Sequence, residues 1–192
     1  MQSFEIIISI FLGIGLAAAV GFRVFLPLLI LSLASYCDVI SPNENWLWIG
    51  NLSVVMTLGV ATLVEIFGYY IPWLDNLLDT IALPLATLAG TAVMVATVTD
   101  LSPVFTWSLA IIAGGGTAAV IKGNASVARL TSTTTTAGVG NPIIATVETA
   151  IAAVMAFASI FIPILAFIFV ALLFIILFRF YKKLNKNRLP RT

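Results

Sequence analysis

The chain has 192 residues, of which 61% are hydrophobic and only 9% are charged, and its mean hydropathy is +1.15. Soluble domains carry about 25% charged residues, so this chain lacks the polar surface that a water-soluble globule needs. The same composition excludes a disordered chain, a secreted disulfide scaffold and a nucleic-acid-binding protein. The sequence therefore indicates an integral membrane protein whose first partner is the lipid bilayer.

The residue types that are missing narrow the chemistry. The sequence has no histidine, and Cys37 is its one cysteine. Histidine-based triads, histidine metal sites and internal disulfides are therefore excluded. We expect no metal site and no cofactor, and we expect Cys37 to be an ordinary apolar residue near a helix end.

The N-terminal apolar run covers residues 4–36. A bilayer core of about 30 Å needs about 20 helical residues, so this run is too long for one span. Small, charged and imino residues interrupt it at Gly21, Arg23 and Pro27. The pattern predicts a spanning helix over 4–22, a broken or re-entrant region near 21–27 and a shorter helix over 24–36. The polar composition of 37–45 predicts a loop.

A second hydrophobic segment covers 46–70 and is followed by an amphipathic stretch near 72–80. Pro72 suits a first helical turn, and the apolar residues after it recur at helical spacing. Asp75 and Asp79 lie four apart on the other face. We expect a short interfacial helix at the membrane surface. Its two carboxylates could hold a divalent cation, although such a pair more often forms a solvated face.

Further hydrophobic stretches predict spans over 81–99 and 104–121, the second ending near a lysine. Residues 122–142 form the least apolar long segment. Residues 143–181 are almost continuously hydrophobic and are interrupted at Pro163. They could form two spans with a tight turn, or a partial span followed by a full one.

These segments predict an all-α fold, a polytopic transmembrane helix bundle with about six membrane segments, five to seven being allowed. We expect a single transmembrane domain over 1–181 and a basic cytoplasmic tail over 182–192. Six of the nine basic residues lie at 179–191, so the positive-inside rule places the C-terminus in the cytoplasm. Counting back, 71–80 lies inside, whereas 37–45 and the turn after the third span lie outside.

Small residues recur at every fourth position in three of the predicted helices. They are Gly13, Ala17 and Gly21, then Ala82, Ala86 and Gly90, and then Gly114 and Ala118. Small residues at this spacing let helix backbones approach closely in lipid. The faces could pack within the chain, or they could form the interface of a homo-oligomer or of a larger membrane complex.

Arg23 is flanked on both sides by long stretches of mainly apolar residues. An arginine at the bilayer centre costs about 2.5–3.5 kcal/mol, so we expect it to face a carboxylate, a backbone carbonyl, an anion or a water-filled cavity. Glu65 is the first candidate partner and Glu148 is the second. Glu148 could instead stabilise the start of its own helix through the helix dipole.

Six consecutive hydroxyl residues occupy 131–136 and precede a Gly-rich turn. Asn141 resembles a helix N-cap and Pro142 a first helical residue. One interpretation is a broken helix near 129–142 that binds an ion or a phosphate group, with Arg129 adding positive charge. The alternative is a cytoplasmic loop followed by a capped helix. The predicted substrate or ion pathway comprises Arg23, Glu65, Arg129, Thr133, Thr134, Thr135, Thr136, Asn141 and Glu148.

Three motifs carry a family resemblance: GLAAAVGFRVFLPLL over 15–29, PWLDNLLD over 72–79 and GVGNP over 138–142. Together, over roughly 10–165, the chain resembles the uncharacterised multi-pass membrane proteins grouped as domain of unknown function 4126. The resemblance implies a protein of the bacterial inner membrane or of a plastid (thylakoid-type) membrane. It brings no activity, cofactor or site residue. Thr149 stands where the family pattern suggests a second acid, which leaves a paired-carboxylate role there in doubt.

Two functions compete. A small transporter or channel, for an ion, an anionic solute or a lipid head group, predicts a polar cavity lined by Arg23 and the hydroxyl run. A structural or assembly subunit of a larger complex predicts that Arg23 is sealed in an ion pair beside an open apolar or small-residue face. An intramembrane enzyme is the least favoured reading, because no histidine and no paired nucleophile and base are present. We favour transport.

Overall fold

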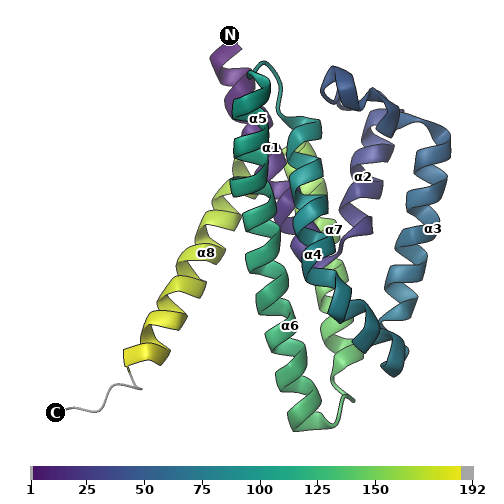
Figure 1. Cartoon of the computed structure of the whole chain (residues 1–192), viewed down its shortest axis with the longest axis vertical. Helices are drawn as coiled ribbons and strands as arrows, with labels where there is room; N and C mark the ends of the chain where they lie inside the picture. Colours follow the sequence, from purple (N-terminus) through teal and green to yellow (C-terminus); the bar gives the residue numbers. More distant parts are fainter. Residues whose placement is uncertain (1, 187–192) are drawn as a thin grey trace.

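The computed structural model describes residues 2–186, without the side chains of 2, 72, 73, 76, 180 and 184–186. Throughout this part of the chain the regular elements are helices (Figure 1), so the predicted all-α fold is confirmed. Their bounds are α1 Gln2–Phe22, α2 Phe25–Tyr36, the 3₁₀ helix η1 Glu44–Gly50, α3 Leu52–Gly68, α4 Pro72–Thr97, α5 Pro103–Leu109, the π-helical η2 Ala110–Gly115, α6 Gly116–Thr136, α7 Asn141–Phe161 and α8 Pro163–Lys186.

Five continuous helical stretches are long and apolar enough to cross a membrane. They are Ser3–Phe22, Leu77–Thr97, Pro103–Thr136, Asn141–Phe161 and Pro163–Lys183. A sixth candidate combines η1 and α3, which are bent by 65° where they meet. The described chain therefore has five or six candidate spans, in agreement with the expected bundle of about six membrane segments.

The predicted break near 21–27 separates α1 from α2. Figure 1 shows α1 running from the N-terminal end into the bundle and α2 returning toward the same end. Arg23 therefore lies at the tip of a helical hairpin. The two helices match the predicted ranges 4–22 and 24–36 closely.

Helix α1 forms the centre of the bundle and contacts α4, α6, α7 and α8. Its small residues are used in these contacts. A Cβ atom on Gly21 would lie 2.9 Å from the Ala118 carbonyl oxygen of α6, and one on Gly13 would lie 2.7 Å from Thr97 Oγ1 of α4. The small-residue faces thus pack within the chain, and a role for them between subunits stays a prediction.

Two element boundaries differ from the prediction. The amphipathic stretch near 72–80 is not a separate interfacial helix, because α4 continues from Pro72 to Thr97 with Pro84 inside it. The span expected to end near 121 continues to Thr136. Basic side chains normally mark the end of a span, but Lys122 is 1% exposed and contacts Tyr69 and Asp79 inside the bundle. The break predicted near 129–142 narrows to the turn at 137–140.

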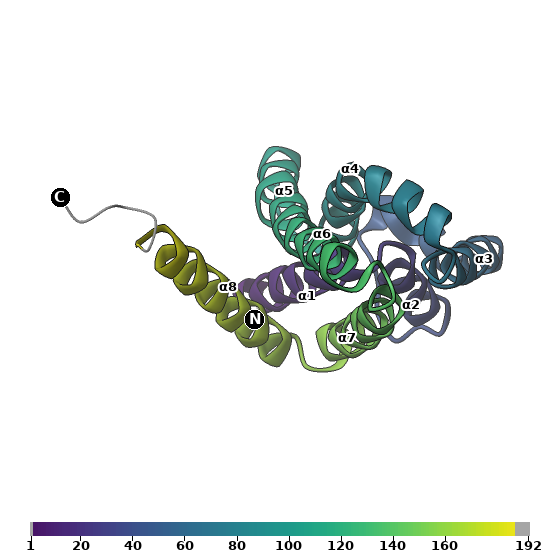
Figure 2. The same ribbon diagram turned by 90° about the horizontal axis from the view of Figure 1, so that it is seen from below.

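Residues 143–181 follow the two-span alternative, since α7 ends at Phe161 and α8 begins at Pro163. Figures 1 and 2 show α8 leaning away from the other helices. Helix α8 includes 182–186, so the first part of the predicted basic tail extends this helix. Residues 187–192 lie outside the described residues.

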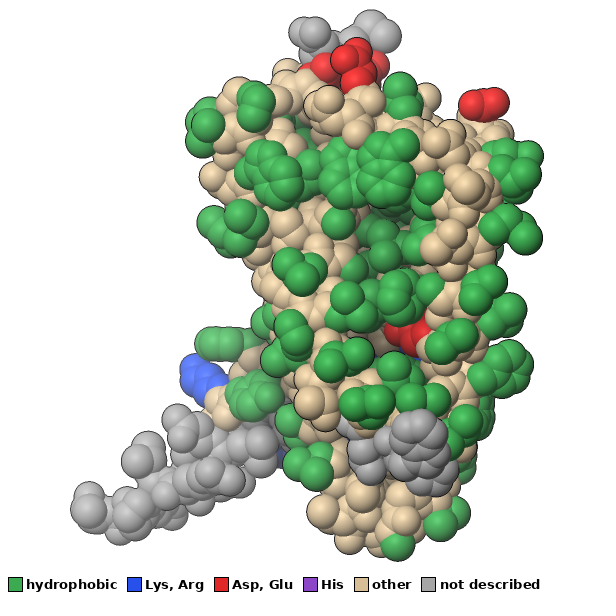
Figure 3. Space-filling model, turned by 45° about the vertical axis from the view of Figure 1, so that its right-hand side comes forward, with side chains coloured by type: hydrophobic (Ala, Val, Ile, Leu, Met, Phe, Trp, Pro, Cys, Tyr) green, Lys and Arg blue, Asp and Glu red, His purple; other side chains and the backbone are tan. Residues whose placement is uncertain are grey.

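The connections segregate to two ends of the bundle. Figure 1 shows the loops at 37–50 and 98–102 at the end where the N-terminus lies, which we call the N-terminal end. The turns at 69–71 and 137–140 lie toward the opposite, C-terminal end, together with the end of α8. The segments predicted to lie on the same side of the membrane therefore lie at the same end of the bundle. Figure 3 shows hydrophobic side chains over the length of one flank and acidic side chains at the N-terminal end, as a bilayer-embedded protein requires.

Candidate functional site

Seven charged side chains from α3, α4, α6, α7 and the connection between α1 and α2 gather inside the bundle. They are Arg23, Glu65, Asp75, Asp79, Lys122, Arg129 and Glu148. We call them, together with Tyr69 and Asn141, the buried charge cluster. Six of the seven are buried, and only the Asp79 side chain is partly exposed, at 23%. Buried charges are stable only when they are paired and hydrogen-bonded, so the contacts of each one define the site.

Arg129 of α6 connects two acids. Its Nε and Nη2 groups donate to the two carboxylate oxygens of Glu148, and its Nη1 group donates to Asp75 Oδ1 at 2.7 Å. The bidentate pair fixes α6 against α7, and the Asp75 bond adds α4. Glu148 lies beyond the first turn of α7, so the alternative in which it stabilises the start of its own helix is wrong, and it pairs with Arg129 instead.

Arg23 is fully buried at the tip between α1 and α2. Its Nε donates to Thr149 Oγ1 at 2.9 Å, and its Nη2 donates to the Ala145 carbonyl at 2.7 Å. Nη2 also lies 4.0 Å from Glu148 Oε2. Of the two predicted acidic partners, Glu148 is the one that pairs with Arg23. Thr149, which stands where a second acid was expected, supplies a hydroxyl acceptor.

Glu65 of α3 has a different role from the predicted one. Its Oε1 accepts a hydrogen bond from Val24 N at 2.7 Å, and its Oε2 accepts one from Phe25 N at 3.0 Å. These N–H groups belong to the start of α2, where no preceding helical turn supplies acceptors. Glu65 thus caps α2 from a neighbouring helix and fixes the hairpin tip that carries Arg23.

Tyr69, which follows α3, is a member of the cluster that the sequence did not single out. The guanidinium carbons of Arg23 and Arg129 each lie 4.1 Å from the centre of its ring. Its hydroxyl accepts a hydrogen bond from Lys122 Nζ at 3.1 Å. Burial, and then the nearby Asp79 carboxylate, raise the pKa of the Tyr69 phenol, so it stays neutral beside the cations. Its position just before the PWLDNLLD motif was the only sequence signal.

Asp75 and Asp79 do not form the predicted solvated face. Asp75 is 4% exposed and bonds Arg129, whereas Asp79 Oδ1 lies 3.8 Å from Lys122 Nζ. Each acid therefore faces a different cation, and the two do not converge as ligands of one divalent metal.

The residues of the hydroxyl run differ in their hydrogen-bond partners. Thr133 Oγ1 accepts a hydrogen bond from Asn141 Nδ2 at 3.0 Å, and the same amide donates to Asp75 Oδ2 at 3.1 Å. All four predicted threonines are exposed, but the other three bond carbonyls of their own helix. These three are Thr134, Thr135 and Thr136. Of the four, Thr133 is the one that bonds a residue of the cluster.

Asn141 is the first residue of α7 and not its N-cap, which is Gly140. The run itself is helical, and several of its hydroxyls bond backbone carbonyls one turn earlier. The chain reverses where Ala137 and Gly138 adopt positive φ angles of 52° and 86°. This turn brings Asn141 back beside Thr133.

A cavity of about 190 Å³ adjoins the cluster at the C-terminal end of the bundle. Its lining residues are Tyr69, Tyr70, Asp75, Thr133, Ala137, Gly138, Asn141 and Pro142. Three of these, Tyr69, Asp75 and Asn141, also belong to the buried charge cluster. Arg23 does not line this cavity, and Thr133 is its one lining residue from the hydroxyl run, so the expected cavity lined by both Arg23 and the run is not found there.

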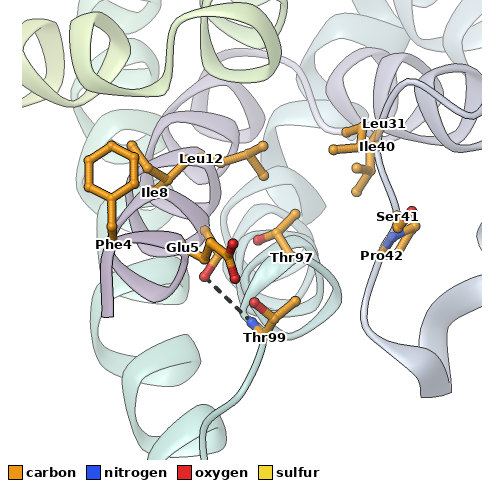
Figure 4. Close-up of a pocket in the computed structure, with 11 residues that line it drawn as sticks. Phe4, Glu5, Ile8, Leu12, Leu31, Ile40, Ser41, Pro42, Thr97 and Thr99 are labelled. Carbon is orange, nitrogen blue, oxygen red and sulfur yellow. Dashed lines mark hydrogen bonds between the residues drawn. The ribbon is translucent and has the colours of Figure 1, made fainter. Parts of the chain in front are cut away.

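A second cavity, of about 300 Å³, lies at the N-terminal end between α1, the loop before η1 and the end of α4. Figure 4 shows apolar residues of α1 on one side and Thr97 and Thr99 beside Glu5. Thr99 N donates to Ser9 Oγ at 3.5 Å within it. The two cavities thus lie at opposite ends of the bundle.

The fold and the cluster define a multi-pass helical membrane protein with a buried network of ion pairs. The chain belongs to the family described as Domain of unknown function (DUF4126), whose model matches residues 10–183. The resemblance seen in the three motifs is thereby confirmed and extends through most of α8. No curated protein and no solved structure matches the chain.

Proposed function

We propose that the protein is a small transporter or channel for an ion or a small polar solute. The observation that carries this proposal is the continuity between the cavity at the C-terminal end and the buried charge cluster, through Tyr69, Asp75 and Asn141. A solute that enters this cavity meets charged and hydrogen-bonding groups that lead toward Arg23 at the centre of the bundle.

The energetics of burial support a functional role for the cluster. Taking an ion pair out of water costs several kcal/mol per ion, and well-packed apolar residues often stabilise a core equally well. Ionisable groups inside membrane bundles typically mark solute or ion pathways. A cluster of seven charges around one tyrosine is therefore more than a helix bundle needs for its packing.

The proposal includes an orientation. Basic residues of α8 lie at the C-terminal end, and the exposed acids Glu5, Asp38, Glu44 and Asp100 lie near the N-terminal end. This asymmetry favours a cytoplasmic C-terminus, in a bacterial inner membrane or a plastid-type membrane. The cavity beside Asp75 then opens toward the cytoplasm.

A flux assay in liposomes tests the proposal with a matched pair of variants. Thr133→Val removes the hydroxyl that lines the cavity, whereas Thr135→Val removes an exposed hydroxyl two residues away. We expect flux above that of empty liposomes for the wild type and for Thr135→Val, and about tenfold less for Thr133→Val, since one polar contact contributes roughly 1–1.5 kcal/mol. Size-exclusion chromatography in detergent checks that each variant is folded. Equal flux from both variants contradicts a pathway past Thr133.

A second candidate function is a structural or assembly subunit. It is favoured by the complete burial of Arg23 and by the large apolar side chains that α8 exposes, among them Ile176 and Phe178. No flux for any tested ion, together with an Arg23→Ala variant that fails to fold, would select this role and make Arg23 an internal brace.

A further inference from the structure

The cavity at the C-terminal end is lined by hydrogen-bond acceptors that still have capacity. The Asn141 side-chain amide donates hydrogen bonds from Nδ2 to Asp75 and to Thr133. These bonds leave the amide oxygen, Oδ1, to be considered. This oxygen is buried and has no hydrogen-bond donor. Asn141 as a whole is 8% exposed. A buried acceptor without a donor destabilises the folded protein, and a bound cation would offset that cost.

Asp75 has acceptor capacity as well. Its Oδ1 accepts from Arg129 and its Oδ2 accepts from Asn141. An ionised carboxylate offers about four lone-pair sites, so roughly half of this capacity is unused. Thr133 Oγ1 accepts from Asn141 and, unlike its neighbours in the run, makes no bond to its own helix. Three different helices thus contribute residues with oxygen-bearing side chains to the lining of one cavity.

The net charge of the cluster also favours a cation. Arg23, Lys122 and Arg129 carry three positive charges, whereas Glu65, Asp75, Asp79 and Glu148 carry four negative charges when ionised. The cluster therefore has one surplus negative charge. Both N–H groups of the Asn141 amide are already used, so the cavity offers an anion little in return for its desolvation.

We propose that this cavity binds a small monovalent cation through Asp75, Thr133 and Asn141. A carboxylate, an amide oxygen and a hydroxyl form a set of hard oxygen donors, which hard cations prefer, and the single surplus negative charge of the cluster favours a monovalent one. Membrane transporters use such oxygens at helix breaks to hold coupling ions. The inference rests on the proposed function in one respect: the cation is the transported or the coupled ion.

Binding of radioactive Na⁺ to the purified full-length protein in detergent tests this inference, with choline replacing Na⁺ at constant ionic strength. We expect saturable binding that unlabelled Na⁺ or K⁺ displaces and choline does not. Thr133→Val and Asn141→Ala should weaken it by about tenfold or more, because each removes one ligand oxygen. Thr135→Val, at a residue that does not line the cavity, should bind as the wild type does.

The outcomes separate the two proposals. Saturable binding without flux upholds the cation site and rejects transport, whereas flux without cation binding rejects the site alone. Absence of displaceable binding in the wild type overturns the inference even if a variant fails to fold. Undiminished binding in folded Thr133→Val and Asn141→Ala overturns it too, because the ion then lies elsewhere. Stabilisation by chloride in choline buffer, without any effect of Na⁺, would place an anion there and also overturns it.

Discussion

Glu65 illustrates how one side chain controls the geometry of the cluster. Its two oxygens accept the first free N–H groups of α2 and hold the tip where Arg23 lies. Glu65→Gln keeps one acceptor and turns an NH₂ group toward a backbone N–H, so we expect it to reduce the free energy of unfolding by about 1–3 kcal/mol. Thermal unfolding in detergent measures this, with exposed Thr135→Val as the control. An unchanged melting temperature would mean that the cap contributes nothing to stability.

The sequence predicts that Arg23 needs a polar partner inside the membrane, but it does not identify which residue that partner is. The apolar surroundings of Arg23 predict that it needs a carboxylate or a carbonyl, and the structure supplies both. The choice between Glu65 and Glu148 depends on how α3 and α7 pack around the hairpin tip, which periodicity does not encode. Tyr69 was missed for the same reason, because its role exists only where two arginines from distant helices converge on its ring.

At the scale of elements, α4 packs closely against η2 and α6 because glycines without side chains lie at the contact. A Cβ atom on Gly114 would lie 2.5 Å from the Gly90 carbonyl oxygen, whereas one on Gly116 would meet nothing within 4 Å. Gly114→Ala should therefore destabilise the protein by about 1–3 kcal/mol, because overpacking forces the helices apart. Gly116→Ala should be neutral or slightly stabilising, since alanine favours helix. Equal melting temperatures for the two variants would contradict this close contact.

The sequence predicted where the helices lie, but it did not predict where some of them end. Hydropathy located the stretches that became α1, α2, α7 and α8, and Pro163 marked the break between the last two. The same reasoning ended a span at Lys122, because a lysine in lipid is expensive. That cost disappears when Tyr69 and Asp79 receive the ammonium group, and this compensation comes from α4 and the end of α3, far away in sequence.

At the scale of the whole molecule, the two ends of the bundle define a sidedness that the native cysteine can report. Cys37 is exposed and lies in the loop after α2 at the N-terminal end, opposite the end of α8. With a cytoplasmic C-terminus, a membrane-impermeant maleimide should label Cys37 in intact cells. In a Cys37→Ser background, a cysteine introduced by Lys183→Cys should react only after permeabilisation.

The two labelling experiments form a matched comparison of the two ends of the bundle, because each protein has a single thiol and the same helices. The opposite pattern, with the Lys183→Cys variant labelled in intact cells, would invert the protein and place the cavity beside Asp75 on the outer face. The positive-inside rule would then fail for the basic end of α8. In that orientation the surplus negative charge of the cluster would attract external cations first, so the direction of labelling also fixes the side from which a cation reaches Asn141.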